Sequence, residues 1–416
     1  MNLLPRALRL SSCALLSLTI LASPAKAFPS TPWRLPTTST TMFTTLGSQT
    51  TVVSPVTTTT TTTTTARTTR GLSATSGGGR SSSDKQDTTE GFTREHHVEL
   101  STGVSMLVLS SLPNKDDTNK PTLLFLHGSF HGAWCWTEYF FPYFTHLGYP
   151  VVALSWRGTG GTPAGQGVKK VKIMEHVADL DSLLGQLESV IGGTAAAENA
   201  STAKRPPPVL IAHSFGSLAI MKYLEAYPER CQNISGVAIL CGVPPSGNGR
   251  LTMRTLRRSL VDSWKITAGF AMKRCTKKAD LCRDLFFGEP VYTREDGTVE
   301  DYGISDDDVA RYQTYFARDS EATIDLLDLA KILPSAAAED GVAPFAKQVP
   351  STLVLGASRD FIVDEQGNQE TAAYFGLDQP VMVDSPHDIM LGSQWRNAAD
   401  ALAKWLGELE MSSDQQ

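Results

Sequence analysis

Acidic residues are missing from the first 83 positions of this 416-residue chain, which hold seven Lys or Arg but no Asp or Glu. The remaining positions, 84–416, are acidic overall, with 30 basic and 43 acidic residues. An acidic body disfavours nucleic acid as a partner, because proteins that bind the phosphate backbone present basic faces. An acid-free beginning is typical of a targeting segment.

Cysteine is scarce, and its spacing excludes the common metal and redox motifs. Only six cysteines are present, and no two stand in a C-x-x-C arrangement. No phosphate-binding lysine follows the Gly-rich run at 157–162, which disfavours a phosphate loop. We therefore predict no metal and no cofactor. Cys275 and Cys282 could form a disulfide in an oxidising compartment, and their spacing leaves this open.

A membrane-spanning run is also lacking at the N-terminus, because the apolar stretch Leu10–Leu21 is too short to cross a bilayer comfortably. Arg6 and Arg9 precede this stretch, and the small-x-small pattern Ala25-Lys26-Ala27 follows it. These features predict a secretory signal peptide over residues 1–27. An uncleaved signal anchor is the alternative.

Residues 28–92 lack hydrophobic periodicity and are rich in Thr, Ser, Pro and Gly, with nine consecutive Thr at 57–65. This composition cannot bury enough apolar surface to offset the entropy of ordering the chain. We predict a disordered transit peptide or linker. The run A-K-A-F-P at 25–29 and the acid-free segment after it resemble the two-part presequences of algae with secondary, red-lineage plastids. That resemblance implies import into a plastid, and secretion with an O-glycosylated linker is the alternative.

From residue 93 the pattern changes to short apolar strands that alternate with amphipathic helices. Such alternation predicts an α/β fold, a mostly parallel sheet with helices on both faces. We place the core at 93–244 and 346–411, and an inserted helical cap at 245–345. The expected strands are His97–Leu100, Val104–Leu109, Leu123–Leu126, Tyr149–Ser155, Val209–Ala212, Val237–Leu240, Leu353–Leu355 and Val381–Val383. The expected helices of the core are Ile173–Ile191, Phe215–Tyr227, Gln366–Phe375 and Trp395–Leu409.

The stretch Pro207–Met221, P-P-V-L-I-A-H-S-F-G-S-L-A-I-M, is the strongest motif in the chain. It places Ser214 between a predicted buried strand and a predicted helix, with Ala212 two residues before and Gly216 two residues after. A sharp strand-to-helix turn needs small residues there, because the backbone closes on itself. The pattern matches the nucleophile elbow G-x-S-x-G, with Ala in the first position. An ordinary helix start with Ser214 as its N-cap is the alternative.

Two further polar residues, Asp360 and His387, each follow a predicted strand and complete the chain order Ser, Asp, His. The carboxyl ends of parallel strands share one edge of a sheet, so the three side chains are expected together. His387 would take the Ser214 proton during nucleophilic attack and return it to the leaving group. Asp360 would accept the imidazole N–H and fix its tautomer.

Two other carboxylates, Asp364 and Asp388, are alternative acids. We favour Asp360, because Asp364 is placed to cap the following helix and Asp388 adjoins the histidine itself.

An oxyanion needs preorganised N–H donors, and two backbone positions are suitable. We predict the N–H of Phe215, directly after the nucleophile, and that of Ser129, in the loop H-G-S-F-H-G-A-W-C-W at 127–136. The same loop supplies the predicted substrate-binding residues, which are Phe130, His131 and Trp134.

Residues 93–411 resemble the α/β-hydrolase superfamily. The stretches L-H-G-S-F-H-G-A-W-C-W, A-H-S-F-G-S and P-H-D-I-M-L are similar to its serine esterase and hydroxynitrile-lyase-like branch, and to plastid-directed α/β-hydrolases of plants and algae. The resemblance implies the same five site residues and a cap at 245–345. Lyases of this branch carry Lys directly after the catalytic His, where this chain has Asp388. That departure disfavours cyanohydrin lysis and favours ester hydrolysis.

The sequence therefore predicts a serine hydrolase that cleaves a carboxylic ester or an acyl lipid through an acyl-enzyme. Alternatives that keep the triad are a lyase, a C–C hydrolase, cofactor-free haloperoxidase-like chemistry and a ligand-binding protein. Epoxide or haloalkane hydrolysis is disfavoured, because it needs a carboxylate where Ser214 stands. The expected partner is a small-molecule or lipid ester and not nucleic acid. Peripheral membrane contact through the cap and the oligomeric state stay open.

Overall fold

The computed structural model describes residues 93–115, 117–192, 205–288, 292–294, 296–300 and 303–413. For residues 292, 293, 299, 300, 412 and 413 it describes the backbone alone. The predicted signal peptide over 1–27 and the predicted transit peptide or linker over 28–92 lie outside these ranges.

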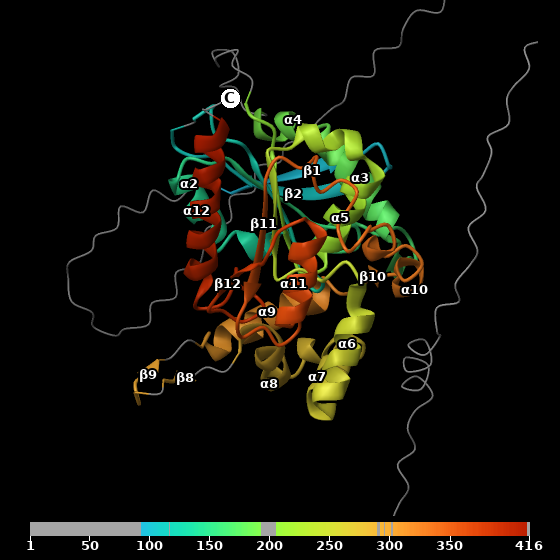
Figure 1. Cartoon of the computed structure of the whole chain (residues 1–416), viewed down its shortest axis with the longest axis vertical. Coiled ribbons are helices and arrows are strands. Elements are labelled where there is room, and N and C mark those ends of the chain that lie inside the picture. The colour runs from blue at the N-terminus through green and yellow to red at the C-terminus, as the bar shows by residue number, and fades with distance from the viewer. Residues whose placement is uncertain are drawn as a thin grey trace, which may run out of the picture. The chain divides into compact units, whose positions relative to one another are not determined.

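An eight-stranded sheet runs through the described residues in the order β1-β2-β4-β3-β6-β7-β11-β12 (Figure 1). The pairs β1–β2 and β2–β4 are antiparallel, and every pair from β4 to β12 is parallel. The predicted fold class, a mostly parallel sheet in an α/β architecture, is therefore confirmed. The strands of this sheet are β1 Arg94–Glu99, β2 Ser105–Ser111, β3 Leu123–Leu126, β4 Val151–Leu154, β6 Val209–His213, β7 Gly236–Leu240, β11 Thr352–Ala357 and β12 Val381–Val383.

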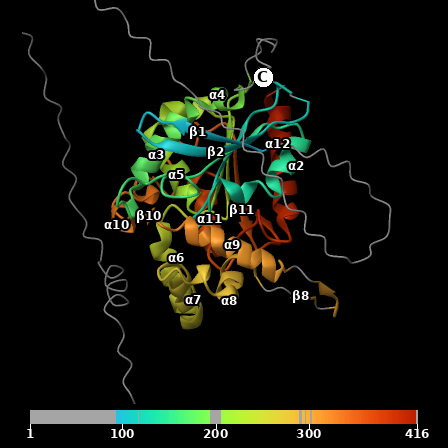
Figure 2. The ribbon, with the colours of Figure 1, turned by 180° about the vertical axis from the view of Figure 1, so that it is seen from behind.

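Helices cover both faces of the sheet, as the opposite views of Figures 1 and 2 show. Helix α2 packs against α12 on one face, and α3 packs against α5 on the other. The helices that flank the sheet are η1 Ala133–Trp136, α2 Phe140–His146, α3 Ile173–Leu184, α4 Leu187–Gly192, α5 Gly216–Ala226, η2 Pro228–Asn233, α11 Glu365–Tyr374 and α12 Trp395–Ser413.

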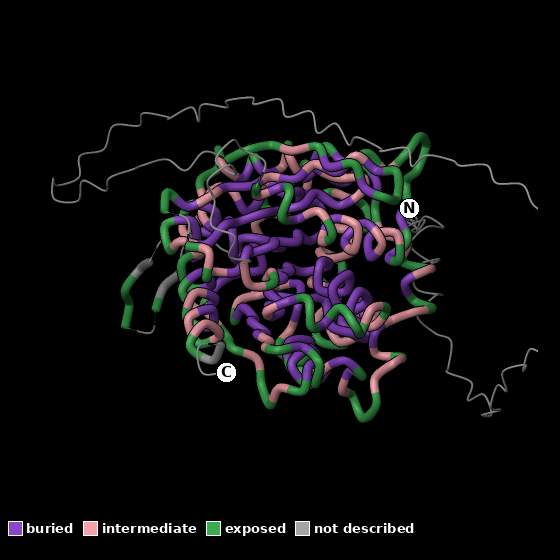
Figure 3. Tube along the Cα trace, turned by 90° about the horizontal axis from the view of Figure 1, so that it is seen from above, coloured by how far each residue is buried: buried purple, intermediate pink, exposed green. Residues whose placement is uncertain are grey.

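Alternate residues of each central strand contribute to two separate hydrophobic cores, because successive side chains of a strand point to opposite faces. Phe125 of β3 and Ile211 of β6 lie in the core that includes α2 and α12. Leu124 and Leu210, one residue earlier, lie in the core that includes α3 and α5. Burial therefore runs continuously along the central strands (Figure 3). This explains why their sequences are apolar runs without alternation.

One predicted helix, Ile173–Ile191, is wrong in its extent, because the chain forms two helices there. α3 ends at Leu184 and is followed by the C-cap Gly185, a residue of low helix propensity, and α4 begins at Leu187. Between them the Gln186 side-chain amide donates hydrogen bonds to the carbonyls of Glu99 and Ser182. The apolar spacing continues across the break, which is why periodicity alone predicted a single helix.

The segment 245–345, which we call the insert, lies between β7 and β11 in the chain. Figures 1 and 2 show its helices α6 to α9 gathered at one end of the molecule. Its helices and strands are α6 Gly247–Arg258, α7 Leu260–Phe270, η3 Arg274–Thr276, α8 Ala279–Cys282, η4 Arg283–Phe287, β8 Tyr292–Thr293, β9 Val299–Glu300, α9 Asp306–Arg318, β10 Thr323–Ile324, α10 Leu326–Leu329 and η5 Pro334–Ala336.

The insert is fastened to the rest of the chain by backbone and side-chain bonds. β10 pairs in parallel with β5 Lys170–Val171. The buried Asp319 carboxylate accepts hydrogen bonds from the Gly160 N–H at 2.9 Å and from the Trp134 indole at 2.7 Å. These bonds hold the end of α9 against η1, which follows β3, and against the loop that follows β4.

Cys275 and Cys282, which could have formed a disulfide, are both buried free thiols. Within the described ranges, every helix is too short or too polar to cross a lipid bilayer.

Candidate active site

Ser214 occupies a strained turn between β6 and α5. Its φ of +51° lies in the left-handed region that residues other than glycine rarely adopt. A Cβ added at Gly216 would stand 2.9 Å from the Leu126 carbonyl oxygen and 3.0 Å from that of His127. Position 216 therefore needs a small residue, because the turn passes close to the carboxyl end of β3. Strain of this kind is typical of functional positions.

Ser214, His387 and Asp360 form a continuous hydrogen-bonded array. The Ser214 Oγ lies 3.1 Å from His387 Nε2, and His387 Nδ1 lies 2.8 Å from Asp360 Oδ2. The second Asp360 oxygen accepts the N–H groups of Ile362 at 2.7 Å and Val363 at 2.8 Å. The carboxylate is thus fixed from both sides and orients the imidazole toward the serine. Each of the three side chains follows the carboxyl end of a strand, as the chain order predicted.

Asp364, one of the two alternative acids, lies in a different network. Its side chain caps α11 by accepting the Gly367 N–H at 2.9 Å. It also accepts two hydrogen bonds from the Arg254 guanidinium, at 2.6 and 2.7 Å. Asp364 therefore caps α11, as the sequence pattern predicted, and it also pairs with Arg254, which the sequence pattern did not predict.

The electrostatic surroundings of His387 favour its protonated form. Burial alone would lower its pKa, but the adjacent Asp360 carboxylate, assisted by Asp388, raises the pKa above its ordinary value of 6.5. The Nδ1–H is committed to Asp360. In the neutral tautomer the Nε2 lone pair therefore faces the Ser214 hydroxyl. This arrangement can accept a proton from Ser214 and stabilise the resulting imidazolium.

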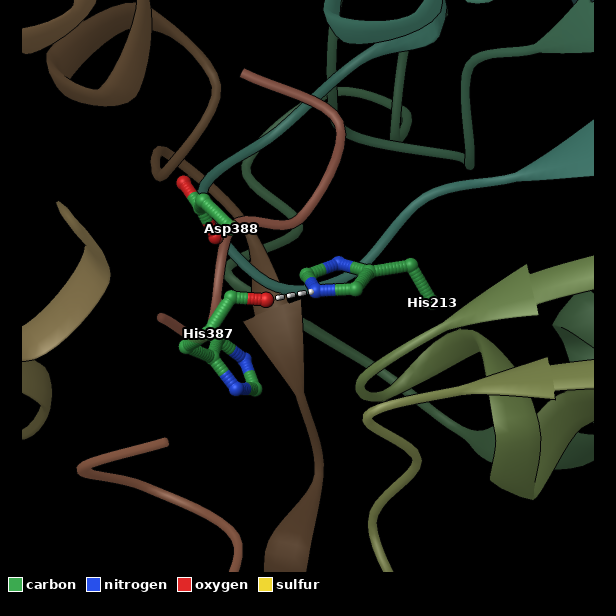
Figure 4. A group of neighbouring side chains, drawn as sticks. All are labelled: His213, His387 and Asp388. Carbon is green, nitrogen blue, oxygen red and sulfur yellow. Dashed lines mark hydrogen bonds between the residues drawn. The ribbon is translucent and has the colours of Figure 1, made fainter. Parts of the chain in front are cut away.

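The neighbouring His213 is a structural group rather than a second base. Its Nε2–H donates to the His387 backbone carbonyl at 3.0 Å, as the dashed line in Figure 4 shows. Burial lowers the pKa of His213 well below 6.5, with the nearby His387 adding to the shift. The imidazole therefore stays neutral, and its bond positions the loop that carries His387.

His127 is likewise neutral. Burial lowers its pKa to about 3. Its Nδ1–H donates to the Gly128 carbonyl at 2.7 Å, and its Nε2 accepts the Trp156 N–H at 3.0 Å. His127 therefore shapes the loop after β3.

Asp388, the other alternative acid, points away from the imidazole of His387 and pairs with His131. Its Oδ2 lies 2.9 Å from His131 Nε2, and both side chains are buried. The other ring nitrogen of His131 lies 2.8 Å from the Ser129 carbonyl oxygen. Both ring nitrogens of His131 therefore face acceptor oxygens. The pair ties the loop that carries Ser129 to the loop that carries His387, a contact that sequence reasoning missed.

The side chains of His213, His387 and Asp388 bring possible metal-ligating atoms within 4.8 Å of one another (Figure 4). Hydrogen bonds already engage His213 Nε2 and both ring nitrogens of His387. Because both ring nitrogens of His387 are bonded to Asp360 and Ser214, the arrangement fits a hydrogen-bonded network.

The two predicted oxyanion donors lie beside the serine. A Cβ added at Gly128 would stand 2.7 Å from Ser214 Cβ, so the loop after β3 passes directly against the nucleophile turn. Within the described ranges, no acceptor pairs with the backbone N–H of Ser129 or of Phe215. Both groups are therefore available to an oxygen atom bound next to Ser214.

The three predicted substrate-binding residues lie in the loop after β3 and pack against the insert. The ring of Phe130 lies 5.3 Å from that of Phe270. The ring of Trp134 stacks on that of His131 with their centroids 5.8 Å apart, and the Trp134 indole N–H donates to Asp319. The polar atoms of His131 and Trp134 are thus engaged within the protein, and the assignment of a substrate-binding role to these residues stays a prediction.

Aromatic side chains of the insert close over the array. Phe286 lies between Phe130 and His387, with ring centroids 6.3 and 6.4 Å away, and Phe316 packs against it at 5.1 Å. Ser214 is only 6% exposed. Sequence reasoning missed Phe316, although the spacing of Val309, Tyr312 and Phe316 along α9 indicates one apolar helix face.

Comparisons with known proteins agree on one family. A family profile described as the alpha/beta hydrolase family matches residues 123–403. Among curated proteins, none matches the sequence. Many solved structures share the fold.

Three of those structures illustrate the range. A carboxylesterase of the thaumarchaeon Nitrososphaera gargenis aligns with a TM-score of 0.51 at 14% identity, over 75% of this chain and 97% of that one. A candidate lipase of Acinetobacter baumannii AYE aligns with a TM-score of 0.50 at 15% identity, over 77% and 93%. An epoxide hydrolase of Vigna radiata aligns with a TM-score of 0.48 at 17% identity, over 76% of this chain and 98% of that one. At such low identity the first two likenesses show the fold alone.

Proposed function

Because this chain belongs to the alpha/beta hydrolase family, we propose that it is a serine hydrolase that cleaves a carboxylic ester or an acyl lipid. The observation that carries the proposal is the array of Ser214, His387 and Asp360, joined at 3.1 and 2.8 Å. Ser214 is the nucleophile, His387 the general base and acid, and Asp360 the group that orients the imidazole.

The first half of the reaction forms an acyl-enzyme. Ser214 Oγ attacks the ester carbonyl carbon while its proton moves to His387 Nε2. The negative charge that develops on the carbonyl oxygen accepts hydrogen bonds from the N–H groups of Ser129 and Phe215. When the tetrahedral intermediate collapses, the alkoxide leaves and takes the proton from His387, so an alcohol is released.

The second half of the reaction uses water in place of the serine. His387 accepts a proton from water as the oxygen attacks the acyl carbon. Collapse of this second intermediate breaks the bond to Ser214 Oγ, which recovers the proton from His387. The products are the free acid and the unmodified enzyme.

Two features support ester hydrolysis over other reactions of this fold. A serine occupies the nucleophile turn, where epoxide or haloalkane hydrolysis needs a carboxylate. Asp388 follows the histidine, where the lyases that the sequence resembles carry lysine. The Asp388 carboxylate, which is buried beside His131, also raises the pKa of His387. It therefore stabilises the positive charge that His387 carries in the transition states of hydrolysis.

The direct test is labelling with a fluorophosphonate probe, followed by a panel of p-nitrophenyl esters of graded acyl length. We expect the wild-type protein to be labelled and Ser214→Ala to be unlabelled, because the probe bonds to the activated serine oxygen. Ser217→Ala, which changes a buried hydroxyl in the same turn, is the matched control and should still be labelled. If wild type is not labelled, or if labelling persists in Ser214→Ala, the serine-hydrolase proposal is wrong.

A second test addresses the oxyanion donors through Gly128. We expect Gly128→Ala to lower kcat by about 10²–10³-fold, because the added methyl group must push either Ser214 or the loop that carries Ser129 out of position. Gly103→Ala, where an added Cβ meets nothing within 4 Å although φ is +79°, controls for a general loss of stability. Steady-state rates on one ester, with melting temperatures measured in parallel, separate the two effects. An active Gly128→Ala variant would contradict the proposed position of the oxyanion.

A further inference from the structure

Helix α7 of the insert presents an apolar stripe to solvent. Leu260 and Val261 are 74% and 64% exposed, the highest values among the large apolar side chains of the described residues. Trp264 is 52% exposed and Met272 47%. The first three recur at helical spacing and so lie on one side of the helix. We call these four residues the α7 face.

Positive charge surrounds the α7 face. Residues 250–278 contain nine Lys or Arg and a single acidic residue, Asp262, although the chain as a whole has a net charge of −6. Exposed cations flank the apolar stripe at both ends of the helix. They are Arg257 and Arg258 at the end of α6, and Arg274, Lys277 and Lys278 after α7.

The cations and the apolar side chains form one continuous surface. The Arg274 guanidinium lies 5.9 Å from the ring centroid of Trp264. A groove beside this contact is lined by both kinds of side chain, among them Trp264, Arg274, Lys277 and Lys278. The other side of α7 faces inward, where Phe270 packs against Phe130 and Phe286. The exposed stripe is therefore not needed to hold the helix in place.

We propose that the α7 face docks the protein on a bilayer surface that contains anionic lipid. An amphipathic helix with exposed aliphatic and aromatic side chains inserts them at the headgroup boundary, and neighbouring Lys and Arg are attracted to anionic headgroups. The body of the chain, residues 84–416, is acidic overall, which disfavours random adsorption of the body to such a surface and favours contact through this basic end. The surface lies outside the array of Ser214, His387 and Asp360.

Charge also argues against the chain's own N-terminal segment as the occupant of the α7 face. Residues 1–83 carry seven basic and no acidic residues, so they would be repelled by the cations around the stripe. A second copy of the chain is the remaining competitor, and its docking would depend on protein concentration rather than on lipid.

Docking through the α7 face would bring lipid next to Phe270, and through it next to the aromatic side chains that close over Ser214. This step rests on the proposed function, and it favours an acyl lipid over a small soluble ester as the substrate. The docking proposal itself does not depend on that chemistry, because vesicle binding and probe labelling at Ser214 are measured separately.

The test is cosedimentation of the full chain with vesicles of phosphatidylcholine, with and without phosphatidylglycerol. We expect binding to vesicles that contain phosphatidylglycerol, weak binding to phosphatidylcholine alone, and loss of binding as salt screens the cations. The double variant Leu260→Ser, Val261→Ser and the double variant Lys277→Glu, Lys278→Glu should each reduce binding at least about tenfold. Probe labelling in solution should be unchanged in both, which shows that they are folded.

Matched controls use exposed residues elsewhere. Leu326→Ser with Leu327→Ser removes two exposed apolar side chains on α10, and Lys169→Glu with Lys170→Glu reverses two exposed cations at the start of β5. Every variant keeps the basic N-terminal segment, so any vesicle binding by that segment is common to all. Equal binding by wild type and the α7 variants overturns the proposal. The proposal is also overturned if the wild-type protein does not bind vesicles and instead forms a concentration-dependent dimer that the α7 variants abolish.

Discussion

Replacing His387 by alanine is expected to lower kcat for a p-nitrophenyl ester by about 10⁴-fold or more, with the fold intact. Among the described residues, His387 is the one side chain hydrogen-bonded to Ser214 Oγ, while the Nε2–H of His213 keeps its bond to the His387 backbone carbonyl, which the substitution leaves in place. His213→Gln is the matched control, since it changes the adjacent imidazole while keeping a donor. Single-turnover and steady-state rates measure the effect. A His387→Ala rate within tenfold of wild type would assign the base elsewhere.

The pH dependence of the wild-type rate follows from the raised pKa of His387. The base is active when neutral, so kcat/KM should rise with pH and level off above the pKa of His387 in the free enzyme. Because Asp360 and Asp388 raise that pKa, the midpoint is expected above 6.5 and not at the ordinary value. Substituting Asp388 by Asn removes one of the two raising charges, so the midpoint should move to lower pH. A midpoint below 6.5 in the wild-type protein would contradict the electrostatic description of the site.

The second large effect is expected at the acid. Asp360→Asn should lower kcat by about 10⁴-fold, because the amide can donate to His387 Nδ1 and so stabilise the wrong tautomer. Asp364→Asn should leave kcat close to wild type. Its cost is the charge-assisted contact with Arg254, about 1–2 kcal/mol in the free energy of unfolding.

The two aspartate variants form a matched pair, since they make the same chemical change four residues apart. Steady-state rates on one ester, together with denaturant unfolding curves, separate the catalytic effect from the stability effect. An inactive Asp364→Asn enzyme beside a nearly normal Asp360→Asn enzyme would reverse the assignment of the acid.

Local pattern was enough to predict the fold and the order of the site residues. Buried strands such as Leu123–Leu126 are apolar runs because both faces of a central parallel strand are covered. Ser214 could be located because a strand-to-helix turn of this sharpness tolerates only small neighbours. The topology of parallel strands then gathers residues that follow their carboxyl ends at one edge of the sheet. All of these constraints act over a few residues or through a general rule of topology, so a single sequence carries them.

Only the tertiary structure decided which partner each polar side chain takes. Local sequence marked Asp364 as a helix cap, but it did not show that Asp364 also meets Arg254, 110 residues away in the chain. Asp388 pairs with His131 across 257 residues. Hydrogen bonds and burial between such distant residues depend on distances of a few tenths of an ångström, which spacing along the chain does not encode. The same holds for the direction of the His387 pKa shift and for the exposed stripe on α7, because both are properties of what surrounds a side chain in space.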